Sequence, residues 1–319
     1  MVAPPFLPVP PPRFGGTVRI VAALADCLYR RGHDVTLFAS GDSTVSARVV
    51  PIVPRALWSE AVQPSQEEAM ASVVDFVENY GEDFDIFHSH LEWHGFAWAR
   101  RSAVPVVSTL HGRIDIGRTA DVIAEYRDIP LIAISGRQRS FAPDQNWVAT
   151  IHHGLPLESV PAGGGSGGYL LFVGRLTPEK GIDAAIELAR RANLPLIVAA
   201  KALEPHEVET YERLVRPAEE DGALRFLGEV GQPARDKLLG DALATVMLGD
   251  WPEPFGLVAV ESMATGTPVL ARRAGALPEI VRDGVDGFVV DSVEDAERAV
   301  AEITALDRAV IRADALRRF

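Results

Sequence analysis

Short apolar runs of strand length alternate with helix-length segments along the whole chain, and this alternation constrains the fold more than any other feature. Unbroken apolar strands separated by helices are typical of parallel sheets whose two faces are both covered. Because the runs form two series, we predict an α/β chain with two doubly wound domains. The predicted strands are residues 35–39, 85–87, 104–109 and 131–134 in the first series and 169–173, 195–199, 224–227, 244–248 and 268–271 in the second, and helical periodicity marks 18–31, 182–192 and 233–239.

A glycine-rich segment separates the two series. The chain has 319 residues, which is enough for two cores, and residues 161–168 (PAGGGSGG) offer almost no side chains for packing. We therefore predict a flexible connector there, with domains at 1–160 and 161–319. The same glycines match the dinucleotide-binding pattern G-x-G-x-x-G, but that pattern follows a strand and opens a helix, whereas this segment precedes a strand.

Charge and composition exclude several classes of function. The 44 acidic residues outnumber the 31 basic ones, for a net charge of −13, which argues against a non-specific nucleic-acid binder. Cys27 is the single cysteine, which excludes an internal disulfide and a multi-cysteine zinc site. No apolar run reaches the roughly 18 residues of a membrane span, and the proline-rich N-terminus lacks the basic flank of a signal peptide. We expect a cytoplasmic protein without a transmembrane segment.

Two cations lie in the loop that follows the predicted strand 169–173. Arg175 and Lys180 flank a turn that enters the next helix. A guanidinium offers two parallel donors and an ammonium is a mobile point charge, so both can converge on one diphosphate. The alternative is a pair of solvated surface cations. Lysine is scarce in this chain, so the position of Lys180 favours the diphosphate.

The motif E-P-F-G-L-V-A-V-E runs from Glu253 to Glu261 and opens a helix. Pro254 and Gly256 mark the helix entry, where free backbone amides attract an anion. Glu253 precedes the helix and Glu261 lies about two turns inside it, so each can bind a hydroxyl-rich group. The alternative is a capped helix with one exposed glutamate. A motif of this length matches by chance far less often than a lone glycine pattern.

Two further sites lie in the first half of the chain. Gly15 and Gly16, between Phe14 and Thr17, precede a helix and can present amides to an anion, although a tight turn with Thr17 as the helix cap explains them equally well. His111 follows a strand in S-T-L-H-G, where an imidazole can donate a hydrogen bond to a substrate. On these residues alone, a structural histidine is the commoner case.

Three other histidines have the spacing of a zinc site. His88, His90 and His94 form H-x-H-x-x-x-H at the end of a predicted strand. No cysteine lies nearby to complete a metal site. We interpret these histidines as structural or site-lining residues.

Taken together, these motifs resemble those of the retaining GT-B glycosyltransferases, in particular family four. The resemblance covers nearly the whole chain, in order. Its motifs are F-G-G-T, G-H-D-V-T-L-F, T-L-H-G, G-R-L-T-P-E-K-G, F-L-G-E-V, W-P-E-P-F-G-L-V-A-V-E, G-T-P-V-L-A and P-E-I-V-R-D-G-V-D-G-F. The family usually has a full first strand and a final crossover helix, and we expect both to be absent here. Val18 stands where the family often has glutamate.

The resemblance implies two facing Rossmann-like domains with an interdomain cleft, the acceptor on the first domain and the nucleotide sugar on the second. It implies that Gly15 and Gly16 approach the donor diphosphate and that His111 touches the donor sugar near the reacting bond. The other implied donor-site residues are Arg175 and Lys180 at the diphosphate, Glu253 at the sugar hydroxyls, Phe255, Gly256 and Leu257 at the helix entry, Glu261 at the ribose, and Val230, in the segment 227–230, at the base.

The implied reaction is transfer of a sugar from a nucleoside-diphosphate sugar, with retention at the anomeric carbon. Arg175, Lys180 and the helix-entry amides would stabilise the leaving diphosphate in place of a metal ion. We therefore expect no metal and no cofactor, and a sugar-bearing or small-molecule acceptor as the second partner. The family favours a front-face route in which the departing phosphate helps to deprotonate the acceptor. Two alternatives stay open, a nucleotide-sugar epimerase on the same fold and a non-catalytic nucleotide-sugar-binding module.

Overall fold

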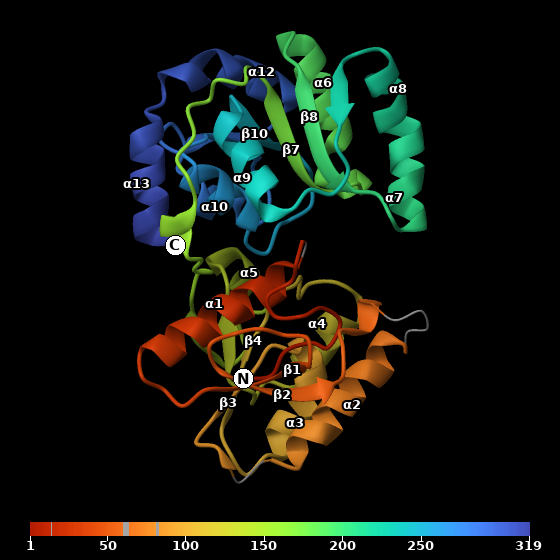
Figure 1. The fold of residues 1–319 in the computed structure, drawn as a ribbon, viewed down its shortest axis with the longest axis vertical. Helices are drawn as coiled ribbons and strands as arrows, with labels where there is room; N and C mark the ends of the chain where they lie inside the picture. Colours follow the sequence, from red (N-terminus) through yellow and green to blue (C-terminus); the bar gives the residue numbers. More distant parts are fainter. Residues whose placement is uncertain (14, 60–63, 81–82) are drawn as a thin grey trace. The chain divides into compact units, whose positions relative to one another are not determined.

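The chain divides into two compact units, Met1–Leu155 (unit 1) and Pro156–Phe319 (unit 2) (Figure 1). The computed structural model describes residues 1–13, 15–59, 64–80 and 83–319. Each unit has its own parallel sheet covered by helices, as the alternation in the sequence predicts. The expected boundary at 160/161 lies a few residues after this division.

Every strand pairing in the described part of unit 1 is parallel. Val2 bridges Phe38 of one strand and Ser89 of another, so residues 2–3 join the two groups of strands into one sheet. The strands are β1 (Thr36–Ser40), β2 (Arg48–Val53), β3 (Phe87–Ser89), β4 (Val106–Thr109), β5 (Leu131–Ala133) and β6 (Trp147–Thr150), in the spatial order β2-β1 and β3-β4-β5-β6.

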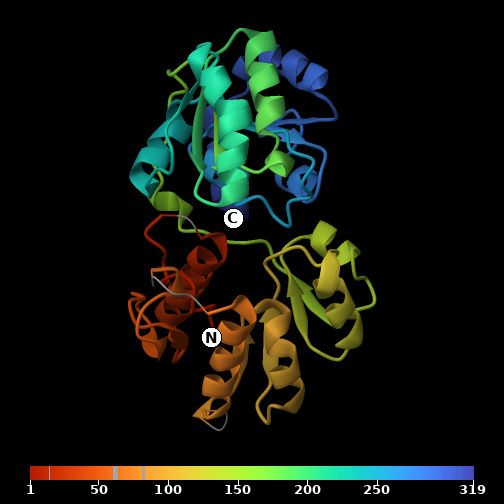
Figure 2. The same ribbon diagram turned by 90° about the vertical axis from the view of Figure 1, so that its right-hand side faces the viewer.

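The helices of unit 1 cover this sheet with apolar faces that recur at helical spacing. In α1 the buried residues include Val18, Val21, Ala22 and Ala25, which share one face of a helix. A capping box between Ser65 and Glu68 fixes the start of α2. Figure 2 shows α2 beside the segment formed by η3 (Glu92–Gly95) and α3. The helices are α1 (Gly16–Arg30), α2 (Gln66–Glu78), α3 (Phe96–Arg101), α4 (Gly117–Glu125) and α5 (Gly136–Ser140).

The sheet of unit 2, whose residues are all described, has six parallel strands in the order β9-β8-β7-β10-β11-β12. The chain begins in the middle at β7, builds outward to β9, and returns to the middle at β10. This reversal between β7 and β10 is a topological switch point, outside which ligands of doubly wound sheets bind. The strands are β7 (Leu170–Arg175), β8 (Leu196–Lys201), β9 (Leu224–Phe226), β10 (Ala244–Met247), β11 (Val269–Arg272) and β12 (Gly287–Val290).

Helices bury the two faces of this sheet. In α6 the residues Ile182, Ala185, Ile186 and Ala189 are buried and join the core that includes Val198 of β8. Burial of an isoleucine side chain is worth about 1.5–3 kcal/mol. The helices are α6 (Ile182–Ala192), α7 (Pro205–Thr210), α8 (Arg216–Glu220), α9 (Gln232–Asp241), α10 (Leu257–Ala264), α11 (Leu277–Ile280), α12 (Val293–Glu302) and α13 (Arg308–Arg318). No helix among the described residues combines the length and apolar character needed to cross a membrane.

The glycine-rich segment is bound to unit 2 and is not a free connector. The N–H of Gly163 donates to the Thr265 carbonyl at 2.8 Å, and the N–H of Gly165 donates to the Gly240 carbonyl at 3.0 Å. A Cβ on Gly163 would lie 2.1 Å from the backbone of Gly240. The glycines therefore permit a close backbone approach. The prediction of a flexible connector is wrong, because these bonds hold the segment against unit 2.

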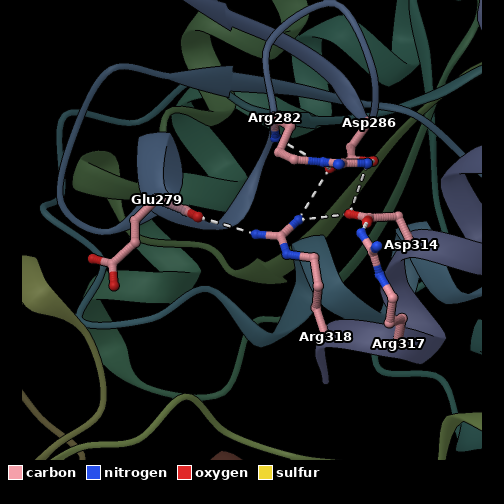
Figure 3. A network of polar contacts seen from close by, with 6 residues as sticks. All are labelled: Glu279, Arg282, Asp286, Asp314, Arg317 and Arg318. Carbon is pink, nitrogen blue, oxygen red and sulfur yellow. Dashed lines mark hydrogen bonds and ion pairs between the residues drawn. The ribbon is translucent and has the colours of Figure 1, made fainter.

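A network of charged side chains around two buried carboxylates fastens α13 to the turn before β12 (Figure 3). Arg318 Nη1 lies 2.9 Å from Asp314 Oδ2 and 3.1 Å from Asp286 Oδ2. Arg282 Nη2 lies 2.9 Å from the same oxygen of Asp314, and Arg317 also pairs with Asp314. Both carboxylates are buried and need these partners to offset their desolvation. The network thereby fixes the segment P-E-I-V-R-D-G against the helix.

Candidate active site

Two loops of unit 2 pack against each other at the switch point between β7 and β10. A Cβ on Gly181 would lie 2.4 Å from the amide nitrogen of Gly249, and a Cβ on Gly249 would lie 2.3 Å from the Glu179 carbonyl oxygen. The Trp251 N–H donates to the same Glu179 carbonyl at 3.1 Å. Only glycine permits this approach, so the two glycines place the Arg175–Lys180 loop beside the loop that carries Glu253.

Lys180 and Glu253 form an ion pair between these loops. Their side chains are 19% and 18% exposed, and the Lys180 ammonium lies 5.5 Å from the ring centre of Trp251. The cation expected at the diphosphate and the carboxylate expected at the sugar are therefore in direct contact. An ion pair that is still partly open to solvent can accept a third, charged partner.

Arg175, at the end of β7, is exposed, and its guanidinium makes no hydrogen bond or ion pair with another described residue. In the register of the sheet it lies beside Lys201 of β8, which sequence reasoning did not assign to the site. Lys201 Nζ lies 3.6 Å from Glu204 Oε1 and 4.0 Å from Glu207 Oε2. The carboxyl ends of β7 and β8 thus carry two cations, and the loop that leaves β7 carries Lys180.

The positive charges of Lys201 and Arg175 affect the pKa of Glu207. Burial acts to raise the pKa of its carboxyl, but N–H donors from Leu203 and Glu204 and the charges of Lys201 and Arg175 outweigh burial and lower the pKa. The Arg175 guanidinium is therefore near enough to influence a buried carboxylate while it stays available to a ligand.

The entry to α10 is a constrained turn. Gly256 has φ of 103° and precedes Leu257, the first residue of the helix. A Cβ on Gly256 would lie 2.8 Å from Leu277 Cδ2, and Phe255 is buried. The first amides of a helix lack an intrahelical acceptor, so this rigid entry leaves N–H groups for an anion.

Gly275 supports Glu253 and was not identified from the sequence. Its φ is 57°, and a Cβ there would lie 2.2 Å from the Glu253 amide nitrogen. The next residue, Ala276, donates its N–H to the Glu253 carbonyl at 2.8 Å. The backbone of Glu253 is therefore held by the turn before α11, a contact that no local sequence signal announces.

Glu261 is buried and paired. Arg235 Nη2, from the first turns of α9, donates to Glu261 Oε1 at 3.0 Å. Arg235 is 8% exposed and Glu261 is 4% exposed. The alternative of an exposed glutamate on a capped helix is thus wrong. Arg235 was missed because it lies outside the recognised motifs. It connects α10 with the helix that follows the 227–230 loop, where Val230 is half-buried.

His111 of unit 1 follows β4 and contacts a second histidine. His90 Nδ1, after β3, lies 2.9 Å from His111 Nε2. His88 Nε2 lies 2.7 Å from Thr109 Oγ1, and the ring of His153 stacks on that of His111 at 5.2 Å. Strands β3 and β4 are adjacent, which explains why residues at their carboxyl ends meet.

These four histidines are neutral at pH 7. Burial lowers the pKa of His88 and of His153 to about 4, with smaller contributions from neighbouring positive charge. Burial also lowers the pKa of His90 and His111 well below the ordinary value, and the neighbouring histidines add to the effect. A neutral imidazole can donate one hydrogen bond and accept another.

Glu92 holds the loop that carries His111. Its Oε1 accepts the His111 N–H at 2.8 Å, and its own φ is 53°, an uncommon conformation for a residue other than glycine. Burial raises the pKa of Glu92 to about 7, against the opposing bonds from the amides of His111 and Gly112. Local strain and a shifted pKa together are typical of functional sites, and the sequence analysis did not identify Glu92.

The two glycines at the start of α1 adopt a constrained turn. Gly15 has φ of 131° and precedes the helix, which begins at Gly16. A Cβ on Gly15 would lie 2.8 Å from Leu7 Cδ1, so glycine is required here. Thr17 lies inside the helix and does not cap it. Phe14 of the predicted motif lies outside the described residues.

The histidines considered for zinc do not assemble with other ligands. His94 Nδ1 lies 3.1 Å from the Leu91 carbonyl oxygen, whereas His88 and His90 face the end of β4. Within the described ranges, no group of three or more His, Cys, Asp or Glu side chains has the arrangement of a metal site.

Both halves of the chain match known protein families. Residues 14–149 match the family described as Glycosyltransferase Family 4, and residues 165–309 match the family described as Glycosyl transferases group 1. The chain is 28% identical to a D-inositol 3-phosphate glycosyltransferase of Mycolicibacterium smegmatis, over 92% of this chain and 79% of the relative. It is 29% identical to the protein of the same description from Mycolicibacterium vanbaalenii, over 93% and 79%.

Solved structures share the fold. AviGT4, a glycosyltransferase involved in avilamycin A biosynthesis, has a TM-score of 0.71 at 23% identity, covering 99% of this chain and 88% of its own. The HepE protein of Anabaena, solved in complex with UDP-glucose, has a TM-score of 0.75 at 18% identity, covering 97% and 93%. At these identities the likeness concerns the fold, and the expected α/β architecture with GT-B neighbours is confirmed.

Proposed function

Because the chain belongs to the group 1 glycosyltransferases of family 4, retaining enzymes that use nucleoside-diphosphate sugars, we propose a division of roles among its residues. Unit 2 binds the donor and unit 1 supplies the acceptor side. The observation that carries this proposal is the meeting of Lys180 and Glu253 at the switch point of the unit 2 sheet.

Arg175 and Lys180 bind the donor diphosphate. Arg175 is exposed at the end of β7, and Lys180 is held nearby by Glu253. As the bond to the sugar breaks, negative charge grows on the diphosphate, and fixed cations stabilise that charge more than they stabilise the intact donor. The amides at Gly256 and Leu257 add to this field because they open α10.

Glu253 binds the hydroxyls of the donor sugar. Its carboxylate already contacts the Lys180 ammonium, so sugar and diphosphate are recognised by two groups that orient each other. The Gly275 turn fixes its backbone. Glu261 accepts hydrogen bonds from the ribose, and Arg235 holds its carboxylate in place at 3.0 Å. The base lies at residues 227–230, next to Val230.

His111 touches the donor sugar near the reacting bond, and the Gly15 and Gly16 amides approach the diphosphate. With no carboxylate assigned as a covalent nucleophile, retention follows a front-face route. The glycosidic bond of the donor breaks, the sugar gains oxocarbenium character, and the departing phosphate oxygen accepts the proton of the acceptor hydroxyl as the new bond forms on the same face. We also propose a cytoplasmic location, since the exposed Cys27 thiol suits a reducing compartment.

A UDP-hexose is the first donor to test, because a structural neighbour binds UDP-glucose. Purified protein is screened by thermal shift against UDP, GDP, ADP and dTDP sugars, and a ligand at 100 times its Kd adds about 2.7 kcal/mol of stability. The stabilising donor is then incubated with polyol and sugar-phosphate acceptors, including the inositol 3-phosphate named for the relatives. Arg175→Ala and Lys180→Ala should each reduce the shift by about half or more. Lys237→Ala, at an exposed lysine paired with Asp241, is the matched control.

The products separate the alternatives. Transfer gives a glycosylated acceptor with the anomeric configuration of the donor. An epimerase would instead give an altered sugar in the absence of any acceptor, and a binding module would give a thermal shift without product. If no nucleoside-diphosphate sugar stabilises the wild-type protein, the proposed donor site is wrong.

A further inference from the structure

The loop that carries His111 is held by a buried glutamine that was not identified from the sequence. Gln138 lies in α5, after β5, and is 1% exposed. Its Nε2 donates to the Leu110 carbonyl at 3.0 Å and to the Gly112 carbonyl at 2.8 Å. Its Oε1 accepts the Ile134 N–H at 3.0 Å. One side chain therefore binds the backbone on both sides of His111.

The partners of Gln138 fix the orientation of its amide. A backbone carbonyl can only accept a hydrogen bond and a backbone N–H can only donate one. Rotation of the amide by half a turn would place its oxygen against the Leu110 and Gly112 carbonyls and its nitrogen against the Ile134 N–H. The side chain also starts from a fixed backbone, because the Gln138 N–H donates to Ser135 Oγ, the cap of α5, at 2.9 Å.

Glu92 binds the same loop from its other neighbour. The Glu92 carboxylate accepts the His111 N–H at 2.8 Å and also accepts the Gly112 N–H. Glu92 follows β3 and Gln138 follows β5, and β4 lies between these two strands. The loop after β4 is therefore bound from two directions, through its N–H groups by Glu92 and through its carbonyls by Gln138.

Two features of Glu92 are costly for the fold. Its φ of 53° lies in the left-handed region, which residues other than glycine seldom occupy, and burial raises the pKa of its carboxyl to about 7. Strained backbone and buried ionisable groups cluster at functional sites. The chain accepts both costs at the loop that carries His111, while Leu110 and Ile114 anchor the ends of that loop in the core.

We propose that Gln138 and Glu92 are positioning residues that hold the loop after β4 in the conformation in which His111 meets the donor sugar. The inference rests on the proposed function, which assigns His111 to the sugar. Both residues bind the backbone of the loop, whereas the His111 ring contacts His90 and His153. Loss of either residue should therefore displace His111 without changing its chemistry, and a displacement of about 1 Å can reduce a rate about 100-fold.

The first test measures the loop without any activity assay. Amide hydrogen exchange is followed by mass spectrometry in the full-length protein and in Gln138→Met, which keeps the bulk of the side chain and removes its donors and its acceptor. Peptides that span residues 109–114 should exchange about tenfold faster or more in the variant. Val35→Ala, a core substitution next to the amino end of β1, is the control for general destabilisation and should leave these peptides unchanged. Unchanged exchange in Gln138→Met would overturn the proposal.

The second test compares rates at a temperature well below the Tm of each protein. Gln138→Met and Glu92→Gln should each lower kcat about tenfold or more, while the affinity for UDP, assigned to unit 2, stays within about twofold of the wild type. Glu92→Gln keeps the size of the side chain but replaces one acceptor oxygen with a donor. Val35→Ala should keep the wild-type kcat. A normal kcat in Gln138→Met, despite faster exchange, would overturn the positioning role.

His111→Ala separates failure of the inference from failure of the proposed function. In a His111→Ala background, Gln138→Met should reduce the residual kcat no further, because it acts through His111. Additive losses would show that Gln138 acts on another group and would overturn the inference. If His111→Ala alone keeps the wild-type kcat, the proposed function of His111 is wrong. If His111→Ala loses activity while Gln138→Met does not, only the inference is wrong.

Discussion

The ammonium of Lys180 and the carboxylate of Glu253 form an ion pair between loops that lie 73 residues apart in the sequence. Lys180 lies in the loop after β7 and Glu253 lies in the loop after β10. Their contact is therefore at the switch point of the sheet. Neither side chain can therefore be changed without altering the electrostatic environment of the other.

We expect Lys180→Met and Glu253→Gln to be strongly non-additive. Lys180→Met removes a charged contact to the diphosphate worth about 1.5–3 kcal/mol, so nucleoside-diphosphate affinity should fall at least tenfold. Glu253→Gln should reduce kcat more than nucleotide affinity, because the sugar changes charge in the transition state. The double variant should lose less than the sum of the single losses, by about 1 kcal/mol or more. Calorimetry and initial rates of all four proteins measure the coupling, and strict additivity would contradict a working contact between the two residues.

The buried pair of Arg235 and Glu261 should govern both folding and nucleotide binding. Arg235→Met removes the ion-pair partner of the buried Glu261 carboxylate, which costs about 3–5 kcal/mol. Arg235→Met combined with Glu261→Leu removes both charges and should recover most of that stability, yet it should still bind nucleoside diphosphate poorly. Urea unfolding gives the stabilities. Arg190→Met, at an exposed pair with Asp221, is the control and should change stability by less than about 1 kcal/mol. If the double variant binds nucleotide normally, Glu261 does not bind the ribose.

Acid should destabilise the protein through its buried histidines. The folded pKa of His88 and His153 is about 4, against an ordinary 6.5, so between these values the unfolded chain binds protons that the folded chain does not. Stability is therefore complete above pH 6.5 and is lost as the pH falls toward 4. Glu92, whose pKa is raised to about 7, has the opposite effect on stability between pH 4.5 and pH 7. It is a single group, whereas several buried histidines act together. Thermal unfolding from pH 7 to 5 should show a falling Tm.

The contribution of one histidine can be isolated by substitution. His153 should lower the free energy of unfolding by roughly 2 kcal/mol as the pH falls from 6.5 to 5. The Tm of His153→Gln should therefore fall less over this range than the Tm of the wild type. His33→Gln, at an exposed histidine of the same unit, should follow the wild-type curve. Parallel curves for His153→Gln and the wild type would show that His153 is not buried in its neutral form.

Transfer activity should survive removal of metal ions. In the proposed site the leaving diphosphate meets Arg175, Lys180 and the amides at the start of α10, and these groups would supply the positive field that a divalent ion supplies elsewhere. We expect the same kcat in excess EDTA and in Mg²⁺ or Mn²⁺, measured by release of nucleoside diphosphate. Activity that is lost in EDTA and returns with either ion would contradict this role for the protein cations.

The sequence predicted elements where local signals were strong. The helix Ile182–Ala192 was placed at its observed bounds because Gly181 and Asn193, both at positive φ, mark its ends. Three strands were missed. Arg48–Val53 contains a proline and is largely accessible, Trp147–Thr150 has two exposed positions, and Gly287–Val290 begins with a glycine; all three lie at the edges of their sheets. Such edge segments lack the continuous apolar run that identified the central strands.

Local motifs gave candidate residues for the site but not the contacts between them. Local motifs identified Arg175, Lys180, Glu253 and Glu261 as ligand-binding candidates. Their partners depend on which elements become neighbours, and that is decided by the tertiary packing of distant segments. For this reason Arg235, Lys201 and Gly275, and the contact between His90 and His111, emerged only from the structure.

The separate core of unit 2 leads to a final prediction, that residues 156–319 alone bind nucleoside diphosphate but transfer no sugar. The fragment must begin at Pro156, since Leu157 is buried and its turn packs against α13, and since Gly163 is bonded to Thr265. A fragment that begins at Gly168 would lose these contacts and should be less stable.

Every residue assigned to the nucleotide lies within 156–319 apart from the Gly15 and Gly16 amides, so the fragment should keep most of the affinity of the full chain. His111 and the proposed acceptor side lie in unit 1, so transfer should be absent. Circular dichroism and urea unfolding establish that the fragment folds, and calorimetry with UDP and product analysis follow. A folded fragment that binds no nucleotide would contradict the assignment of the donor to unit 2, and one that glycosylates an acceptor would show that His111 is dispensable.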